Sequence, residues 1–181
     1  MCADFPQYQI LAIQGQNKTG IVSRVTEVLY RHGINIMDSS MTTLRSEFTM
    51  MMVIETGEQA SPFENELMAL NSESLSIFLR PLSEREACHG SSECIPNYSL
   101  SVLGRDQTGM IYRFSELMHA QGINITDVTT RLLDSRSPAL YAMIIECYLE
   151  AADAELNTKI QTLAQEMGVD ARFHALDQIE I

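Results

Sequence analysis

The chain has 181 residues, of which 45% are hydrophobic, and its formal net charge of −12 gives an isoelectric point near 4.6. A field this negative repels phosphate backbones, and no run of lysine or arginine provides a local exception, so we expect no direct binding of nucleic acid. The first residues lack the charged and apolar regions of a signal peptide, and no apolar run approaches the roughly 20 residues of a membrane span. We therefore expect a cytoplasmic protein that does not enter a membrane.

The first predicted element is a strand, because the apolar run 10–13 stops at Gly15. A helix follows, since apolar residues between Ile21 and Leu29 recur at helical spacing while charged residues take the other side. Gly33 stands where a C′ glycine ends a helix. The chain therefore opens with a strand, a tight turn and an amphipathic helix.

The next stretch predicts two strands of different kinds. Residues 35–44 are half polar, which indicates an edge strand, whereas residues 48–54 are apolar at nearly every position, as in a strand paired on both sides. A second helix is predicted over about 61–71 and a last strand over 75–79. The order of elements is βαββαβ.

The same pattern then occurs a second time. Residues 15–38 return at 104–127 with a constant offset of 89, and ten of the 24 positions are identical. The repeat extends to a helix over about 151–167 and a strand over 169–176. An internal repeat of this kind indicates two copies of one module. We predict an α+β protein with two ferredoxin-like βαββαβ modules in tandem, each with antiparallel strands in the order 4-1-3-2 and both helices on one face.

The two modules are predicted to cover residues 1–83 and 98–181. Between them, residues 84–97 are small, polar and aperiodic, which is typical of a linker. The four cysteines form no obvious framework of pairs, so reduced thiols are the simpler interpretation.

The strand-to-helix turn is the first candidate site, because a helix N-terminus presents unpaired N–H groups and a partial positive charge to an anion. The glycine just before each helix lets a ligand approach the backbone. The alternative is that Asn17, Asp106 and the turn threonines cap the helices while the glycines serve a tight turn. The candidate ligand-binding residues are Asn17, Lys18, Thr19 and Gly20 in the first copy, and Asp106, Gln107, Thr108 and Gly109 in the second.

The second candidate site is the motif Gly-Ile-Asn-Ile-x-Asp, which follows the helix in both copies. It falls at the start of the second strand, and we expect it to lie close in space to the first turn, where its Asn and Asp side chains could meet an ammonium group. The alternative is a capped helix end with Asp on the wet edge of the sheet. The candidate residues are Asn35, Ile36, Asp38, Asn124, Ile125 and Asp127.

These residues carry a resemblance to a known family. A turn with Asn-x-x-Gly, followed by an amphipathic helix and Gly-Ile-Asn-Ile, resembles the ACT domain, an amino-acid-sensing module, and two tandem copies cover nearly the whole chain. Two such modules with no attached enzyme, with Asp38 after the motif and Glu-Phe-Thr at 47–49, are similar to the glycine cleavage system transcriptional repressor family. Thr19 and Thr108 stand where the turn of the family usually has proline, which makes the turn less rigid.

The resemblance implies a non-catalytic regulatory protein that senses a small amino acid, with glycine and serine as candidates, and modulates a partner such as a transcription regulator of amino-acid metabolism. The ligand would lie between the turn of one module and the second strand of a neighbour, and a homodimer is one expected assembly. The alternative is a regulatory subunit that docks on a metabolic enzyme. A catalytic function ranks third, because the second half of the chain repeats the first.

Other chemistry has little support in the sequence. The glycines of the first turn have the spacing of a phosphate-binding loop, but Ile21 and Val22 stand where lysine and serine or threonine must hold phosphate and magnesium. Cys88, His89 and Cys94 offer three zinc ligands at a spacing that fits no common site. We expect no catalytic residues, no metal and no cofactor.

Overall fold

The computed structural model describes residues 7–56, 61–88, 95–134, 139–150 and 154–176. The chain divides into two compact units, residues 1–90 and 91–181. Each unit contains one four-stranded sheet. Among the described residues, no helix is both long enough and apolar enough to cross a membrane.

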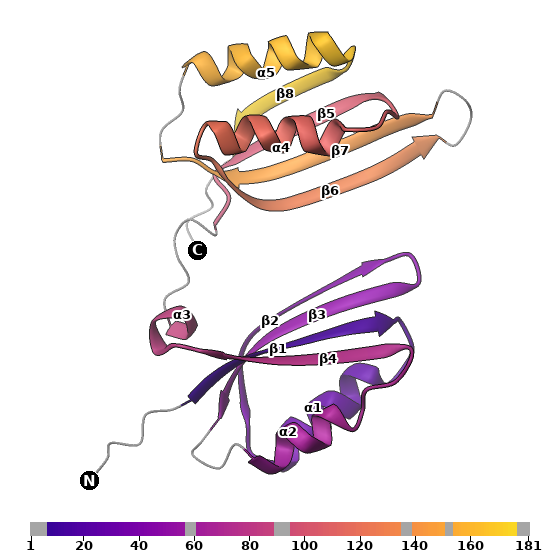
Figure 1. Cartoon of the computed structure of the whole chain (residues 1–181), viewed down its shortest axis with the longest axis vertical. Coiled ribbons are helices and arrows are strands. Elements are labelled where there is room, and N and C mark those ends of the chain that lie inside the picture. Colours follow the sequence, from indigo (N-terminus) through magenta and orange to yellow (C-terminus); the bar gives the residue numbers. More distant parts are fainter. Residues whose placement is uncertain (1–6, 57–60, 89–94, 135–138, 151–153, 177–181) are drawn as a thin grey trace. The chain divides into compact units, whose positions relative to one another are not determined.

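The first module contains β1 (Gln7–Gln16), α1 (Ile21–Arg31), β2 (Asn35–Leu44), β3 (Glu47–Thr56), α2 (Ser61–Met68), β4 (Leu75–Leu82) and α3 (Glu84–Cys88). Its strands pair antiparallel in the order β2-β3-β1-β4, so β1 and β3 are central and β2 lies at an edge. Helices α1 and α2 cover one face of this sheet (Figure 1).

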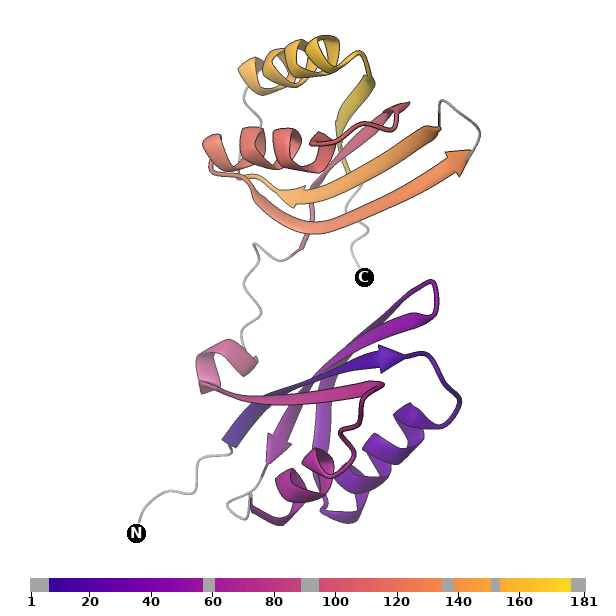
Figure 2. The ribbon, with the colours of Figure 1, turned by 45° about the vertical axis from the view of Figure 1, so that its right-hand side comes forward.

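The second module contains β5 (Tyr98–Arg105), α4 (Met110–Ala120), β6 (Asn124–Asp134), β7 (Leu140–Tyr148), α5 (Ala154–Met167) and β8 (Asp170–Ala175). The strand order is β6-β7-β5-β8, again antiparallel throughout. Helices α4 and α5 lie side by side on one face of the sheet in both views (Figures 1 and 2). The predicted α+β fold, with two βαββαβ modules and the strand order 4-1-3-2, is confirmed.

Each core lies between a sheet and its two helices. In the first module, Val25, Val28 and Leu29 of α1 are buried in one cluster with Leu11 and Ile13 of β1, as the helical spacing of the apolar residues predicts. The corresponding cluster of the second module contains Leu100, Val102, Phe114, Met118 and Ile145.

Helix α1 ends as predicted, in a Schellman motif. Gly33 has a φ of 66°, its N–H donates to the carbonyl of Tyr30 (3.0 Å), and the N–H of Ile34 donates to the carbonyl of Leu29 (3.0 Å). Gly122 has a φ of 67° and ends α4 with the same pair of bonds. The glycine permits the left-handed backbone that turns the chain into the edge strand.

A short helix occupies the first part of the segment 84–97, for which the sequence predicts only an aperiodic linker. Helix α3 begins with a capping box, in which the backbone N–H of Ser83 donates to Oε2 of Glu86 (2.9 Å) and the N–H of Glu86 donates to the Ser83 hydroxyl (3.3 Å). Glu86 also forms an ion pair with Arg80 of β4 at 3.7 Å. The helix contacts β1 and β4, so this part of the segment belongs with the first module.

One cluster of charges links α1 to α2 and predicts a pH dependence. Glu66 accepts one hydrogen bond from Nη2 of Arg31 (2.8 Å) and shares another with Nε2 of His32 (3.1 Å). The hydrogen bond from His32, followed by the positive charge of Arg31, holds the pKa of this carboxyl below its usual 4.5. Because the folded-state pKa is depressed, the contribution to stability is complete above pH 4.5 and is lost as the pH falls through the lowered value.

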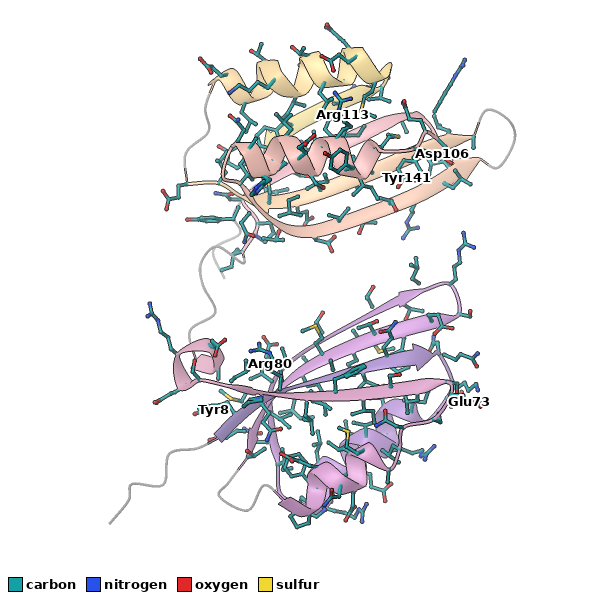
Figure 3. All side chains as sticks on the ribbon, in the orientation of Figure 1. Tyr8, Glu73, Arg80, Asp106, Arg113 and Tyr141 are labelled. Carbon is teal, nitrogen blue, oxygen red and sulfur yellow. The ribbon has the colours of Figure 1, made fainter. Side chains whose placement is uncertain are left out.

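We therefore expect Glu66→Gln to flatten the fall in stability of the first module below about pH 4.5. Thermal unfolding of the variant and the parent, measured at a series of pH values from about 3 to 6, tests this. Glu73→Gln removes the same charge outside the cluster of Arg31, His32 and Glu66, in the turn before β4 (Figure 3), and serves as the control. A parallel shift of the whole curve by Glu66→Gln would contradict the prediction.

Candidate functional site

The strand-to-helix turns are built in the same way in both modules. Glycine is the N-cap residue of α1 and of α4, with a φ of +89° at Gly20 and +95° at Gly109. Residues other than glycine rarely adopt this left-handed backbone conformation. The space beside both glycines is empty, because a Cβ at either position would meet nothing within 4 Å. The glycines are therefore required by the backbone conformation, and the space around them is open.

No side chain caps these helices. Among the described residues, none forms a side-chain cap hydrogen bond at the start of α1 or α4, and neither helix has an acidic residue in its first turn. Capping of the helices by Asn17, Thr19, Asp106 and Thr108, one part of the alternative interpretation, is therefore wrong, whereas its other part, glycines that serve a tight turn, agrees with the positive φ of Gly20 and Gly109. The first N–H groups of α1 and α4 keep the partial positive charge of a helix N-terminus for an anion.

Backbone hydrogen bonds fix each turn beside the hairpin of the second and third strands. The N–H of Asn17 donates to the carbonyl of Ser46 at 2.8 Å, between β2 and β3. In the second module, the N–H of Asp106 donates to the carbonyl of Ala139 at 2.9 Å, just before β7. Figure 3 shows Asp106 at the same end of the second sheet as Tyr141 of β7. The turns are therefore held in place by the sheet.

The two turns also differ at the candidate position that follows Asn17 and Asp106. The side-chain amide of Gln107 donates from Nε2 to the carbonyl of Met167, 2.8 Å away, and thereby stabilises the end of α5. Lys18, at the equivalent position, is exposed and forms no hydrogen bond or ion pair with any described residue. The first turn thus has a cation available to a ligand, whereas the second turn uses its side chain in the fold.

A β-bulge shapes the start of the edge strand in the first module. Asn35 pairs with Glu55 and Asp38 with Val53, and the register shifts between Ile36 and Asp38. Residues three apart on a regular strand lie on opposite faces, but the extra residue of the bulge brings Asn35 and Asp38 to the same face, away from the helices. The Asn35 amide lies 3.5 Å from Oε2 of Glu55. Regular alternation along the strand gives no sign of this arrangement.

The second module repeats the bulge. Asn124 pairs with Tyr148 and Asp127 with Glu146, so these two site residues also share a face. The hydroxyl oxygen of Thr126, the bulged residue, is buried without a hydrogen-bond partner among the described residues. Such a group costs about 1–3 kcal/mol while it stays unsatisfied. The start of β6 therefore holds a polar atom that lacks a partner next to the predicted site residues.

Both aspartates are accessible carboxylates with local hydrogen bonds. Oδ1 of Asp38 accepts the backbone N–H of Ser39 at 2.7 Å, and Oδ2 of Asp127 accepts the hydroxyl of Thr129 at 3.1 Å. Every residue of β2 is exposed, as the polar pattern of this strand predicts. These bonds orient the carboxylates and leave oxygens free to accept from an ammonium group.

The two candidate motifs of one module do not come together, and the expectation that they lie close in space is wrong. Asn35 pairs with Glu55 at one end of β3, whereas Gln16, just before the turn, pairs with Glu47 at the other end. The eight residue steps from position 47 to position 55 separate the two ends by about 27 Å, at about 3.4 Å per step. The physical reason is helix α1, which joins the motifs and runs back along the length of the sheet.

Two hollows reach the second motif of the first module. A groove of about 520 Å³ lies between α1 and β2, and a hollow of about 220 Å³ lies over β2 and β3. The groove is lined by Ser23, Thr26, Tyr30, Asn35 and Ile36, and the hollow by Ile10, Asp38, Ser40, Met51 and Val53. A third cleft of about 360 Å³, between α4 and α5, has no candidate residue in its lining.

The described residues contain no cluster of three His, Cys, Asp or Glu side chains that could hold a metal ion. Of the three zinc ligands considered in the sequence, His89, Cys94 and the side chain of Cys88 lie outside the described part. Burial raises the pKa of the Cys147 thiol to about 11, so this thiol is protonated at neutral pH and is a poor nucleophile.

The sequence is similar to that of several known proteins. It is 22% identical over 174 residues to the glycine cleavage system transcriptional repressor of Escherichia coli, a match that covers 94% of this chain and 90% of that protein. It is 37% identical over 46 residues to a UPF0237 protein of Bifidobacterium longum, a match that covers 25% of this chain and 51% of the relative. The chain thus spans about half the length of that curated relative.

The fold of the whole chain also has a solved counterpart. An unknown protein from Galdieria sulphuraria superposes with a TM-score of 0.78 at 20% identity, over 96% of this chain and 100% of that one. A family model described as ACT domain matches residues 7–76 and 100–174, one segment in each module. Because these two segments make up most of the sequence, the chain belongs to the ACT domain family.

Proposed function

We propose that this protein is a non-catalytic regulator that senses a small amino acid, glycine or serine, through its two ACT modules and passes its state to a partner that regulates transcription of amino-acid metabolism. The observation that carries the proposal is the uncapped helix N-terminus behind a left-handed glycine, which recurs in both modules. The net charge of −12 favours a protein partner over DNA.

The chemistry of an amino acid fits the two halves of the site. Its carboxylate would accept from the first N–H groups of α1 or α4, where the helix dipole favours an anion. Its ammonium group would donate to the oxygens of an Asn and an Asp, which the bulge places on one face of the edge strand.

Because the two halves lie at opposite ends of one sheet, a single ligand needs halves from two modules. When two edge strands pair antiparallel, the start of each strand lies beside the end of the other. The end of β2 leads into the hairpin that holds the turn at Asn17, because the N–H of Asn17 donates to the carbonyl of Ser46 in that hairpin. Antiparallel pairing of neighbouring edge strands would therefore bring the Asn and Asp of one module beside the turn of another.

Such a site couples binding to assembly. A ligand that contacts both modules stabilises the arrangement in which they are paired. The free energy of this stabilisation cannot exceed the difference between the ligand's binding free energies for the paired and the unpaired arrangement. A partner that recognises the paired arrangement would then bind more tightly when the amino acid is present. The same coupling requires that the partner increases the affinity for the amino acid.

A thermal-shift screen against the twenty amino acids tests the proposal. A ligand that binds only the folded protein raises the free energy of unfolding by about 2.7 kcal/mol at a hundredfold excess over its Kd. We expect glycine or serine to raise the melting temperature. Methylamine and ethanolamine, which lack the carboxylate, should give no shift. If no amino acid changes the melting temperature, or if the amines act as well as the amino acids, the proposed site is wrong.

A further inference from the structure

The α4–α5 cleft is a hollow of about 360 Å³ on the helical side of the second module. Its apolar lining residues are Leu117, Ala120 and Leu163, and Leu163 is part of the core beneath the helices. None of the lining residues belongs to the proposed amino-acid sites. A hollow of this volume is as large as sites that bind small molecules, so it has room for a large apolar side chain.

A polar contact joins the two helices at each end of the cleft. Arg113 of α4 points toward α5 (Figure 3) and donates from Nη2 to Oε2 of Glu166 at 2.9 Å. At the other end, Nζ of Lys159 donates to Oε1 of Gln121 at 2.9 Å and lies 3.5 Å from Oε2 of Glu155. Both cations that line the cleft are therefore engaged within the module.

A difference between the two copies of the repeat creates the space between these contacts. At the offset of 89 residues, Ala120 corresponds to Arg31 and Gln121 to His32. In the first module both of these residues reach Glu66 of α2, Arg31 at 2.8 Å and His32 at 3.1 Å. A long side chain thus crosses from α1 to α2 at the position where the second module has only the methyl group of an alanine.

One carboxylate at the rim of the cleft has no cation beside it. Glu116 is exposed, lines the cleft and forms no ion pair with any residue that the structure describes. Its Oε1 accepts the hydroxyl of Tyr112 at 2.7 Å, and Tyr112 is 62% exposed. A carboxylate beside an exposed aromatic ring attracts lysine or arginine, because the charge and the ring face both favour a cation. The formal net charge of −12 adds to this attraction for a basic partner.

We propose that the α4–α5 cleft is the docking site for a basic amphipathic helix of the protein partner. This helix would place an apolar side chain against Leu117 and Leu163 and a lysine or arginine beside Glu116. The groove between two packed helices accepts a row of side chains from a third, and residues three or four apart on a helix are neighbours, so one turn supplies both groups. The inference rests on the proposed function, since it names the surface for the partner invoked there.

A synthetic peptide tests the docking site without any amino acid, so its failure is separate from a failure of amino-acid sensing. The probe is a labelled helix of leucine and lysine with the leucines along one face, and fluorescence anisotropy at physiological salt measures its Kd. A second peptide has alanine for every leucine and keeps the charge. We expect the leucine peptide to bind roughly tenfold more tightly or better, because only its side chains fill the apolar cleft.

Ala120→Arg gives the second module the side chain of the first and tests the shape of the cleft. The added side chain occupies the space between the helices, so we expect it to weaken binding of the leucine peptide by roughly tenfold or more. Gln165→Arg adds the same charge at an exposed position of α5 outside the cleft and is the matched control, with an unchanged Kd. Circular dichroism verifies that both variants are folded.

Glu116→Lys tests the carboxylate at the rim, on a surface position where folding is not at risk. It replaces an attraction by a repulsion and should weaken binding by roughly fivefold or more. Glu27→Lys changes the net charge equally at the corresponding position of α1 and should leave the Kd within about twofold of the wild type. A wild type that does not bind the leucine peptide, equal binding of the two peptides, full binding by folded Ala120→Arg, or equal losses in Glu116→Lys and Glu27→Lys would overturn the proposal.

Discussion

Replacing Gly15 with alanine is expected to destabilise the first module by about 3 kcal/mol, since a Cβ there has no room. An ideal Cβ on Gly15 would lie 2.3 Å from the carbonyl oxygen of Ser74 and 3.0 Å from Cα of Leu75. Both are backbone atoms, one in the turn before β4 and one in the first residue of β4, and the Ser74 carbonyl also accepts the N–H of Gln16 at 3.0 Å. Relief of the clash must therefore move the backbone and break a hydrogen bond.

Gly20→Ala is the matched control for this effect. Nothing lies within 4 Å of a Cβ at Gly20, and only the left-handed backbone opposes a side chain, at a cost of about 1–2 kcal/mol. Urea unfolding followed by far-ultraviolet circular dichroism compares the two variants. A Gly15→Ala loss no larger than that of Gly20→Ala would show that the turn before β4 yields easily.

The fold was predictable because every level of the sequence agrees on it. The helical spacing of Val25, Val28 and Leu29 predicts the buried face of α1, and the polar pattern of 35–44 predicts the exposed edge strand. Glycine after the helix predicts the Schellman motif, since few other residues adopt a φ near 66°. The repeat then gives the second module without further information.

The arrangement of the candidate site was predictable only in part. The sequence identified the turn at Gly20 but not how far it lies from Asn35, because proximity along the chain ignores the length of the helix between them. The bulge at Met37 was not predictable either, since nothing in the sequence marks an extra residue in a strand. That bulge is what brings Asn35 and Asp38 to one face. The helix at 84–88 did have a signal, the capping box of Ser83 and Glu86.

The two amino-acid sites are expected to differ in affinity, with the turn of the first module contributing to the tighter one. That turn has the neutral Asn17 and Lys18, which is unpaired among the described residues, and its six residues from Gly15 to Gly20 carry a formal charge of +1. The second turn sums to zero, with Asp106 at the position of Asn17 and with Gln107 bonded to the end of α5. A ligand carboxylate thus meets a cation at one turn and another carboxylate at the other.

Exchanging the side chains at positions 17 and 106 should reverse much of this difference in affinity. Two carboxylates about 4 Å apart repel by roughly 1 kcal/mol in water, and by more where water is partly excluded, which is a factor of roughly five or more in Kd. Asn17→Asp should therefore weaken the tighter site, and Asp106→Asn should strengthen the looser one. Titration calorimetry with the amino acid that gives the largest thermal shift measures both changes.

Glu150→Gln removes an equal charge beyond the far end of β7, distant from the second turn, and should change neither affinity. Equal affinities in the wild type, or no response to either exchange, would mean that the ligand carboxylate binds elsewhere, because capping by Asn17 and Asp106 is already absent from both helices.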